Sequence, residues 1–560
     1  MSQIFLYLMA STILFTATCF FFGITINAFT LPLSYGIAII CLIFFYNDSI
    51  NSVLFYEILT ATVILGVLIW ISGSIYDNSV DGNLYHKLAI GLLKNNWNPL
   101  SQLPQEQYFK VIAMNDSSQI PSGSLWAETY CKGTWIFAAG IYALTGNIES
   151  GKVYTLLAMV CAFLITIAFL TAKGKRMSFC ILFSLAAMLS PIAIPQFGTY
   201  YVDGFLHLML YILIISLIMQ DQETIFPSKV SWSLIVSSMI ICGNIKFTGL
   251  LYGGIFCIAY FLWFCFKRLK MSNGNFNISL CLKRMIPFAV LAFITIFWAG
   301  NTSYVTNFLR YHNFTYPLSG KGAVDIMTTN SPFAEVNHFK NFFLSIFSKM
   351  NNMMGETAWN NPDSCTLKFP FTVDWVQESQ YLSSPDSRIS GFGIFFSGIL
   401  LISLIIIAVK LIFMKKDFKF YFLCMNLIVC LGLTFGITES WWARYSPYVY
   451  FIVLIALYII LNSHKKIMHV IGYCFAVIII LNASLFFRSV PQYIQMTKQV
   501  HSAFTFLQKD ASVSLYAGDF SGIYFNLNDL GIRYVVDPEI SQDPEAIRLG
   551  YLDLMSVPEI

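Results

Sequence analysis

Long apolar stretches recur along most of this 560-residue chain. A stretch of about 20 apolar residues can cross the hydrocarbon core of a bilayer as a helix. Hydrophobic residues make up 57% of the sequence and charged residues only 11%, which is not the balance of a soluble globular domain. A membrane β-barrel would instead need short strands of alternating polarity, and the long apolar stretches do not have that pattern. The sequence therefore predicts an all-α polytopic membrane protein.

The apolar stretches predict about thirteen transmembrane helices, several of them short for a straight crossing. They cover residues 4–28, 31–46, 54–73, 152–171, 177–194, 204–219, 230–244, 248–266, 285–300, 391–413, 420–437, 447–462 and 467–486. The first stretch is too long for the core of a signal peptide and lacks a basic flank, so we expect it to be a retained helix.

Basic residues in the short loops predict the orientation of the chain. Lys and Arg cluster in four short loops, at residues 173–176, 267–284, 410–419 and 465–466. With the spans given above, all of these loops fall on one side, which the positive-inside rule identifies as cytoplasmic. The chain is also rich in Lys, Asn, Ile and Phe, as is typical of an AT-rich bacterium. We therefore expect a multi-pass protein of the bacterial inner (cytoplasmic) membrane whose large polar segments face the periplasm.

The polar segments divide the chain into regions. These are N-terminal additional transmembrane helices (1–50), a membrane core (51–300) that contains the first outer loop (74–151), a large periplasmic loop (301–390), C-terminal transmembrane helices (391–489) and a small periplasmic domain (490–560).

Two of these polar regions have predicted structure of their own. In the last region, strand-like runs at 512–516 and 532–536 enclose a helix candidate, which predicts a small soluble α/β domain. In the first outer loop, the apolar residues 135–144 are too few to span a membrane, so we expect an interfacial or re-entrant helix there.

Two carboxylates stand at the outer ends of predicted helices. Asp81 follows a long apolar helix and stands beside Tyr85 and His86, while Asp203 begins another apolar stretch. A carboxylate beside a low-dielectric region gains basicity and suits a general base. The alternative for each is a helix-capping role, which the helix dipole would favour. Asp77 has weaker support, and we expect it to be a turn residue.

Two cations stand on the same predicted side. Lys246 separates two apolar stretches, and Arg444 lies in the aromatic sequence Trp441-Trp442-Ala443-Arg444-Tyr445. Positive charge at the membrane rim can neutralise a lipid-linked phosphate, and arginine among aromatic rings suits a phosphate or a stacked sugar. The alternatives are a snorkelling lysine and an aromatic belt anchored by arginine.

Other kinds of site have little support in the sequence. The seven histidines are scattered, and no set of His, Cys, Asp and Glu has metal-ligand spacing, so we assign no metal-ligating residue. The sequence has no basic patch, so we do not expect nucleic acid as a partner. Most of the thirteen cysteines lie in apolar stretches and are expected to be small buried residues. Cys131 and Cys365 lie in the two large outer loops, where a disulfide between them is an open alternative.

The polar sequence around Asp81 and Tyr85, followed by Trp97-Asn98-Pro99, resembles the first outer loop of the GT-C glycosyltransferases. Within that superfamily it looks most like the bacterial relatives of protein O-mannosyltransferase and of the lipid A aminoarabinose transferase. These are polytopic enzymes that take a sugar from a polyprenyl-phosphate carrier. The resemblance covers roughly residues 54–270 in order and spacing.

The resemblance implies a GT-C-like helical bundle and a set of site residues. Asp81 matches the catalytic carboxylate of the first outer loop, Asp203 the second acidic residue, and Lys246 the lysine of a tight outer turn. Residues 132–146 match a short loop helix, with Lys132 in place of the usual basic residue. Two departures are Gly82, where the family commonly continues an Asp-Glu pair, and Glu128-Thr-Tyr-Cys-Lys132-Gly in place of a longer motif. They leave the sugar, the acceptor and any need for a divalent metal open.

The expected function is that of an inverting membrane glycosyltransferase. A sugar would pass from a polyprenyl-phosphate donor in the lipid bilayer to a glycan or glycolipid of the cell envelope, such as a polysaccharide or lipopolysaccharide. Asp81 would act as general base, with Asp203 orienting the acceptor or the first loop, and Lys246 and Arg444 would bind the donor phosphate. The residues expected to contact substrates are Tyr85, His86, Lys132 and Trp442. The alternatives are a transporter or flippase for lipid-linked sugars, an O-antigen-type polymerase or ligase, and a non-catalytic envelope scaffold.

Overall fold

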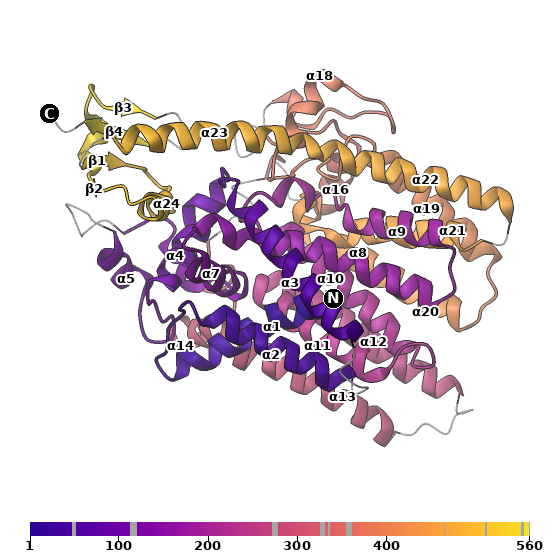
Figure 1. Ribbon diagram of the computed structural model, residues 1–560. Helices are drawn as coiled ribbons and strands as arrows, with labels where there is room; N and C mark the ends of the chain where they lie inside the picture. The colour runs from indigo at the N-terminus through magenta and orange to yellow at the C-terminus, as the bar shows by residue number, and fades with distance from the viewer. Residues whose placement is uncertain are drawn as a thin grey trace.

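A computed structural model describes residues 1–46, 52–112, 120–271, 278–324, 331–333, 337–353, 361–463, 465–509, 512–549 and 554–558. The chain is a polytopic helical membrane protein with a small C-terminal sheet, as the sequence predicts (Figure 1).

Helices that are long and apolar enough to cross a membrane number ten among the described residues. They are α1 (Ser2–Phe21), α3 (Ser52–Gly73), η2 with α8 (Ile148–Ala172), α10 (Asp203–Asp221), α11 (Ser228–Ile245), α12 (Phe247–Met271), α13 with η4 (Ile278–Ala299), α19 (Phe396–Phe413), α20 (Phe418–Gly436) and the run from α22 (Lys466–Ser484) through η10 (Leu485–Arg488) to α23 (Ser489–Leu507). The other three expected spans form the shorter apolar helices α2 (Thr30–Tyr46), α9 (Met177–Met188) and α21 (Pro447–Leu461).

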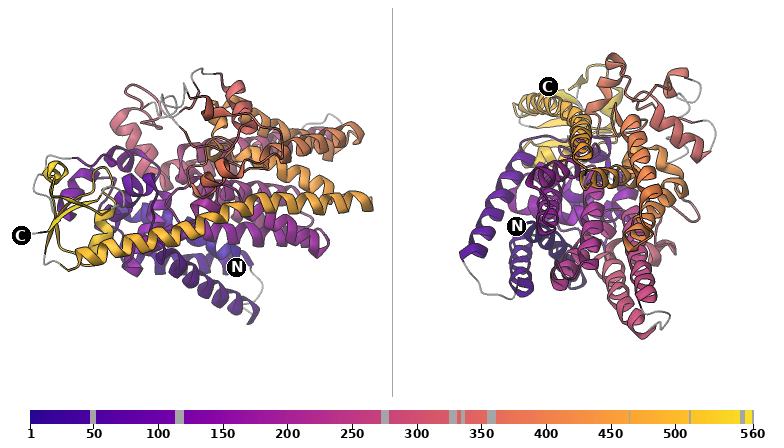
Figure 2. Two further views of the ribbon diagram at one scale, coloured as in Figure 1. Left: turned by 90° about the horizontal axis from the view of Figure 1, so that it is seen from above. Right: turned by 90° about the vertical axis from the view of Figure 1, so that its right-hand side faces the viewer.

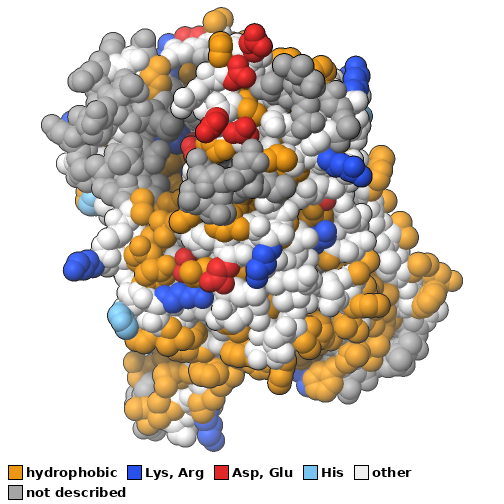
Figure 3. Space-filling view, turned by 90° about the vertical axis from the view of Figure 1, so that its left-hand side faces the viewer, with side chains coloured by type: hydrophobic (Ala, Val, Ile, Leu, Met, Phe, Trp, Pro, Cys, Tyr) orange, Lys and Arg blue, Asp and Glu red, His pale blue; other side chains and the backbone are white. Residues whose placement is uncertain are grey.

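The basic loops meet at one end of the helical bundle, on the right of Figure 1. Lys175 donates to Asn462 Oδ1, Lys267 pairs with Asp221, and the ring of Trp263 at the end of α12 packs on Phe422 of α20. The opposite end carries the large polar segments and the C-terminal sheet, and we call it the outer end. Figure 3 views this end directly, with hydrophobic side chains gathered along its lower and right-hand edges and charged ones nearer the centre and top.

The outer end is built from short helical segments. They are η1 (Gly82–His86), α4 (Lys87–Lys94), α5 (Pro104–Val111), α6 (Ser124–Thr129), α7 (Gly133–Thr145), η3 (Ile194–Gln196), η5 (Asn301–Val305), α14 (Thr306–Tyr311), α16 (His338–Phe347), η6 (Pro362–Cys365), α18 (Trp375–Glu378), η7 (Ser379–Ser383), η8 (Thr438–Trp441) and η9 (Ala443–Tyr445).

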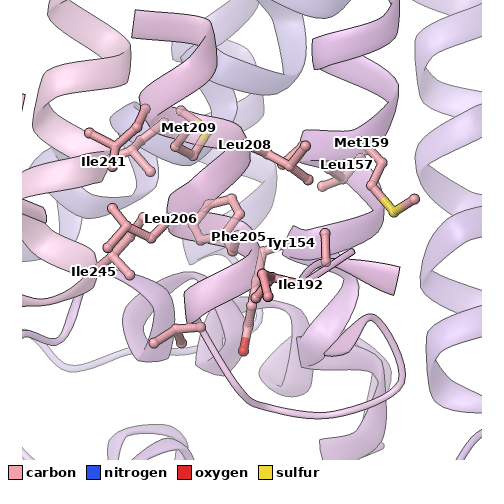
Figure 4. Close-up of a cluster of buried hydrophobic side chains, with 14 of the residues drawn as sticks. Tyr154, Leu157, Met159, Ile192, Phe205, Leu206, Leu208, Met209, Ile241 and Ile245 are labelled. Atoms are coloured by element: carbon pink, nitrogen blue, oxygen red, sulfur yellow. The ribbon is translucent and has the colours of Figure 1, made fainter. Parts of the chain in front are cut away.

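The helix α10 packs against α8, α11 and α12 and lies near the middle of the bundle in Figure 1. Figure 2 shows the same bundle from above and from its right-hand side. The helix α10 has the largest buried share of the long apolar helices in the described chain, at 89%. Figure 4 shows Phe205, Leu206, Leu208 and Met209 of α10 packed against side chains from its neighbours. Since lipid tails are as apolar as these side chains, close packing and buried hydrogen bonds hold the helices together. One such bond, 2.8 Å long, joins the hydroxyls of Thr166 and Tyr211.

Two helices of the N-terminal half are enclosed by their neighbours. The helix α1, one of the expected N-terminal additional helices, lies within the bundle and packs on α2, α7, α8 and α11. The helix α7, for which the sequence left an interfacial or a re-entrant position open, is buried over residues 133–142. It is enclosed because α1, α4, α11 and η2 all pack against it.

The C-terminal region forms the predicted α/β unit. Strands β1 (Val513–Tyr516) and β2 (Tyr534–Val536) are parallel, and α24 (Ile523–Asp529) forms the crossover between them. Two further strands, β3 (Ile547–Arg548) and β4 (Met555–Pro558), complete a sheet of order β2-β1-β4-β3, with η11 (Pro538–Gln542) between β2 and β3.

Buried polar contacts attach this unit to the first outer loop. Asn526 of α24 donates to Glu149 Oε1 at 2.9 Å and accepts from Lys87 Nζ at 3.0 Å. Glu149 itself pairs with Lys87 at 2.5 Å and with Lys152 at 2.6 Å, and all three side chains are at most 1% exposed. Gly522 N donates to Asn83 O at 2.8 Å, directly within η1. The C-terminal unit is therefore part of the wall that holds η1 in place.

The two loop cysteines do not form a disulfide in this structure. Cys131 is buried beside Tyr304 and Phe247, whereas Cys365 packs with Phe333, Trp441 and their neighbours in a separate apolar cluster.

Candidate active site

The four charged residues that the sequence singles out meet at the outer end of the bundle. Lys246 Nζ donates to Asp203 Oδ1 at 2.6 Å. Arg444 Nη1 lies 3.4 Å from Asp81 Oδ2 and 3.6 Å from Asp203 Oδ2. Asp81 immediately precedes η1, Asp203 is in the first turn of α10, Lys246 links α11 to α12, and Arg444 is in η9. Segments that are far apart in the sequence thus contribute to one charged cluster.

The carboxylate of Asp81 does not cap a helix. It precedes η1 but makes no side-chain hydrogen bond to the backbone of that segment. Asp77 has the structural role instead, since its Oδ1 accepts from Ser79 N at 2.8 Å and its Oδ2 from Tyr200 N at 2.9 Å. This agrees with the prediction that Asp77 is a turn residue. The Asp81 carboxylate is left to face Arg444.

Gly82, one departure from the family pattern, is required by this turn. A Cβ atom at residue 82 would collide with Asp77 Oδ2 and Ser79 Oγ. Any larger residue would displace the buried Asp77 carboxylate and the backbone that carries Asp81.

Asp203 does not cap its helix either. Gln196 Oε1 accepts from Gly204 N at 2.7 Å, so Gln196 satisfies this amide in the first turn of α10. Asp203 Oδ2 is buried and has no hydrogen-bond partner. A buried acceptor of this kind is costly unless a ligand or a nearby charge satisfies it.

Lys246 turns toward the carboxylates and does not snorkel into water. Its side chain is 15% exposed, and Nζ lies 4.5 Å from the ring centroid of Tyr445. Burial is the largest single influence and lowers the pKa of Lys246. The charge of Asp203, the influence of Tyr445 and the hydrogen bond to Asp203 together outweigh burial and raise this pKa above its ordinary value. The ammonium therefore stays charged at physiological pH.

Aromatic rings surround the guanidinium of Arg444. Its Cζ lies 4.9 Å from the ring centroid of Tyr201, 4.6 Å from that of Trp442 and 5.0 Å from that of Tyr445. Its side chain is only 7% exposed. Stacking on aromatic faces holds the planar guanidinium in one orientation while its N–H groups stay directed at carboxylates.

Sequence reasoning missed two residues of this cluster, Asp386 and Arg388. Asp386 Oδ1 lies 3.3 Å from Arg444 Nε and accepts from Trp442 Nε1 at 3.1 Å, while its Oδ2 accepts from Arg388 Nε at 2.8 Å. The Arg388 guanidinium lies 4.0 Å from the Trp442 ring centroid. Both residues immediately precede the apolar stretch that becomes α19, the same position at a helix entrance that drew attention to Asp203. A charged residue just before an apolar stretch was therefore the sequence signal that could have identified both residues.

The cluster balances three carboxylates against three cations. Burial raises the pKa of Asp81 above its ordinary value, and the nearby Arg444 offsets only part of this effect. Asp81 is therefore a stronger base than a solvated aspartate. Its side chain is 25% exposed, against 2% for Asp203, so Asp81 stands at the open side of the cluster and Asp203 at its floor.

Tyr85 and His86 form part of an aromatic wall beside the cluster. The Tyr85 ring packs on those of Trp126, Tyr130 and Trp135, and His86 Nδ1 accepts from Trp135 Nε1 at 2.6 Å. Burial, followed by the charge of Lys246, lowers the pKa of His86 to about 3. His86 is therefore neutral at physiological pH and donates no charge to the site.

Lys132 and Trp442 were expected to contact substrates. In the structure, the ammonium of Lys132 and the indole of Trp442 contact other groups of the protein. Lys132 Nζ donates to the carbonyls of Glu128, Tyr130 and Thr302 at 2.7, 3.0 and 2.9 Å, which uses all three of its hydrogens. Trp442 is 1% exposed, which leaves no free face for a sugar ring. In this structure both side chains hold the walls of the site together.

No group of three or more His, Cys, Asp or Glu side chains is placed to hold a metal ion within the described part of the chain.

No family model and no curated sequence matches this chain. Among solved structures, it is similar to the crystal structure of ArnT from Cupriavidus metallidurans in the apo state, with 11% sequence identity and a TM-score of 0.36. That similarity covers 86% of this chain and 76% of the ArnT chain.

Proposed function

We propose that this protein is a membrane glycosyltransferase of the GT-C type that transfers a sugar from a polyprenyl-phosphate carrier to a hydroxyl group of an envelope glycan or glycolipid. The observation that carries the proposal is the meeting of a basic carboxylate, Asp81, with two cations, Lys246 and Arg444, at the outer end of a membrane bundle. A lipid-linked donor presents its phosphate at this level, and the reaction needs a base and a cationic phosphate site close together.

The proposed reaction is one displacement with inversion. Asp81 accepts the proton of the acceptor hydroxyl while that oxygen forms a bond to the anomeric carbon of the sugar. The bond from the anomeric carbon to the phosphate oxygen breaks, and its electrons stay with the lipid phosphate. Lys246 and Arg444 stabilise the negative charge of this leaving group. Asp203 keeps Lys246 directed into the site through their 2.6 Å ion pair. No covalent intermediate with the enzyme is required.

The site also suggests how substrates enter. The exposed side of the cluster, next to Asp81, faces away from the floor formed by Asp203, so the acceptor approaches from the outer aqueous side. The donor phosphate takes the place near Lys246 and Arg444. Asp203 Oδ2 has no hydrogen-bond partner in the protein, so a hydroxyl group of the sugar can donate to it.

Substitution of Asp81 tests this proposal most directly. We expect Asp81→Asn to lower transfer from a polyprenyl-phosphate sugar by about 10²- to 10⁴-fold, the usual contribution of a positioned base, with donor binding retained. The protein would be assayed in lipid nanodiscs with a labelled donor. Asp417→Asn is a matched control because Asp417 caps α20 at the opposite end of the bundle, a role that asparagine also fills. Full transfer by the Asp81 variant would refute the base role, and retained transport of lipid-linked sugar without any transfer by the native protein would favour a flippase.

A further inference from the structure

The large outer loop exposes a strip of apolar side chains that runs from just after η6 into α18. We call the apolar strip the side chains of Leu367, Phe369, Phe371, Val373, Trp375 and Val376. Phe369 and Val376, exposed at 83% and 89%, are the two most exposed large hydrophobic side chains of the described residues. The first five members are alternate residues of the chain, with a turn at residues 370–371 that is closed by a hydrogen bond from Thr372 N to Phe369 O at 3.1 Å. A group of exposed apolar side chains of this size marks a site of contact with an apolar partner.

A charged pair at the two ends of the same segment turns inward. Lys368 pairs with Glu378, and the two side chains are 4% and 0% exposed. Lys368 Nζ also donates to Ile394 O at 2.9 Å, and Glu378 Oε2 accepts from Met350 N at 3.0 Å. A water-facing loop has the reverse arrangement, with charges outside and apolar groups inside. The segment is therefore suited to an apolar environment.

The apolar strip lies where two membrane helices reach the outer end. The Phe371 ring packs so closely on Gly398, in the first turn of α19, that a Cβ atom there would collide with it. The Trp375 ring centroid is 5.7 Å from the guanidinium carbon of Arg488, in the segment η10 that follows α22. The segment η7, which follows α18, packs against η10. Figure 1 shows α18 above the long helix formed by α22 and α23.

Exposed side chains of these helices lead up to the strip. Ile405 of α19 and Leu481 of α22 are exposed, as expected for side chains that face lipid tails. The apolar strip continues this lipid-facing surface beyond the ends of both helices. A tryptophan next to an arginine is also the composition of a membrane interface.

We propose that the apolar strip inserts into the membrane leaflet at the outer end of the bundle and anchors the large outer loop there. The occupant of this surface is the lipid bilayer. The proposal stands on exposure, polarity and position, and it does not depend on the glycosyltransferase activity.

The anchor would also set the height of Asp386 and Arg388 over the site. Ser348 pairs with Leu367 of the strip through an antiparallel bridge, and Asn351 pairs in the same way with Ile389. The short segment 348–351 therefore joins the strip on one side to the neighbour of Arg388 on the other. Insertion of the strip fixes this segment against the membrane surface.

Photocrosslinking of the full-length protein in nanodiscs tests the anchor. The photoreactive residue p-benzoylphenylalanine would replace Phe369 or Val376, and mass spectrometry would detect lipid adducts. Ile405, on the lipid-facing side of α19, is the positive control, and the exposed Gln380 of η7 is the negative control. Because all these side chains are partly or fully exposed, the replacements should leave the fold intact, which size-exclusion chromatography would verify.

We expect lipid adducts at residues 369 and 376 at levels close to those at 405 and at least several-fold above those at 380. Lipid adducts no more frequent than at 380 would overturn the proposal. Adducts to protein alone would also overturn it, and would identify the strip as a docking surface for a second copy or another protein.

Discussion

Arg444 Nη1 lies 3.4 Å from Asp81 Oδ2 across a separation of 363 residues in the sequence. This pair joins the first outer loop to the turn before α21, and it sets the basicity of Asp81. Burial raises the pKa of Asp81, and Arg444 is the largest influence that lowers it again. After burial, Arg444 is therefore the largest influence on the strength of the proposed base.

Removal of Arg444 should shift the pH dependence of transfer. Asp81 acts as a base only when it is deprotonated, so activity is present above its pKa and is lost as the pH falls through that pKa. In Arg444→Gln the pKa of Asp81 rises further, and the acidic limb of the kcat/KM profile should move to higher pH. Arg284→Gln, which removes a partner of Glu223 at the basic end, is the control and should leave the limb in place. If the acidic limb did not shift in the Arg444 variant, the group whose protonation limits activity would not be Asp81.

Asp386 should act on donor binding more than on the chemical step. Its carboxylate contacts Arg444, Arg388 and the Trp442 indole. Among the described residues, the ion pairs of Asp386 are with these two arginines and not with Lys246. Asp386→Asn weakens the hold on both guanidinium groups, so we expect the KM for donor to rise about tenfold, equal to about 1.4 kcal/mol, with kcat nearly unchanged.

Steady-state kinetics with the donor varied would measure this effect of Asp386→Asn. Asp374→Asn is a control in the same loop, because Asp374 caps α18 and pairs with Lys349 away from the cluster. A fall in kcat at constant KM would instead place Asp386 in the chemical step.

Much of the fold follows from hydrophobicity along the chain, because a span of the bilayer needs a continuous apolar helix and each such helix is visible in the sequence. The same logic located Asp81, Asp203, Lys246 and Arg444, since each is a charge at the edge of an apolar stretch. It did not predict that Asp386 would reach them, because nothing local determines how the long loop 301–390 folds back over the bundle.

The sequence did not predict the buried ion pairs either. Glu149 with Lys87 and Lys152 forms a fully buried group, yet no local pattern links Lys87 to Glu149 or either of them to Asn526. The role of Lys132 differs from the family-based expectation for a related reason. Its three acceptors include the carbonyl of Thr302, which only the tertiary fold brings within reach.

The docking of the C-terminal unit should support both stability and activity. Asn526→Ala removes one buried hydrogen bond that Lys87 donates and another that Glu149 accepts, which should lower the free energy of unfolding by about 1–3 kcal/mol. Since η1 and Asp81 rest on the same contact surface, we also expect reduced transfer activity. Thermal unfolding in nanodiscs, followed by tryptophan fluorescence, would measure the first effect. Arg533→Gln, at an exposed position of the same α/β unit, should change neither quantity, and equal behaviour of the two variants would contradict the docking role.

Gly82 gives the most local test of how the turn at Asp81 is built. A Cβ atom at residue 82 would collide with Asp77 Oδ2, which accepts from Tyr200 N, and with Ser79 Oγ, which accepts from Gly82 N. Gly82→Ala should therefore cost about 1–3 kcal/mol of stability, the usual range for overpacking a buried site. It should also reduce transfer, because Asp81 moves with its neighbour.

Gly66→Ala is a matched control for this substitution. Gly66 lies within the helix α3, nothing lies within 4 Å of a Cβ atom built there, and alanine favours helix more than glycine does. The Tm of the Gly66 variant should stay the same or rise, whereas that of the Gly82 variant should fall. If Gly82→Ala kept the native Tm and full activity, the turn would be free to relax, and the close contact with Asp77 would not explain why glycine stands beside the proposed base.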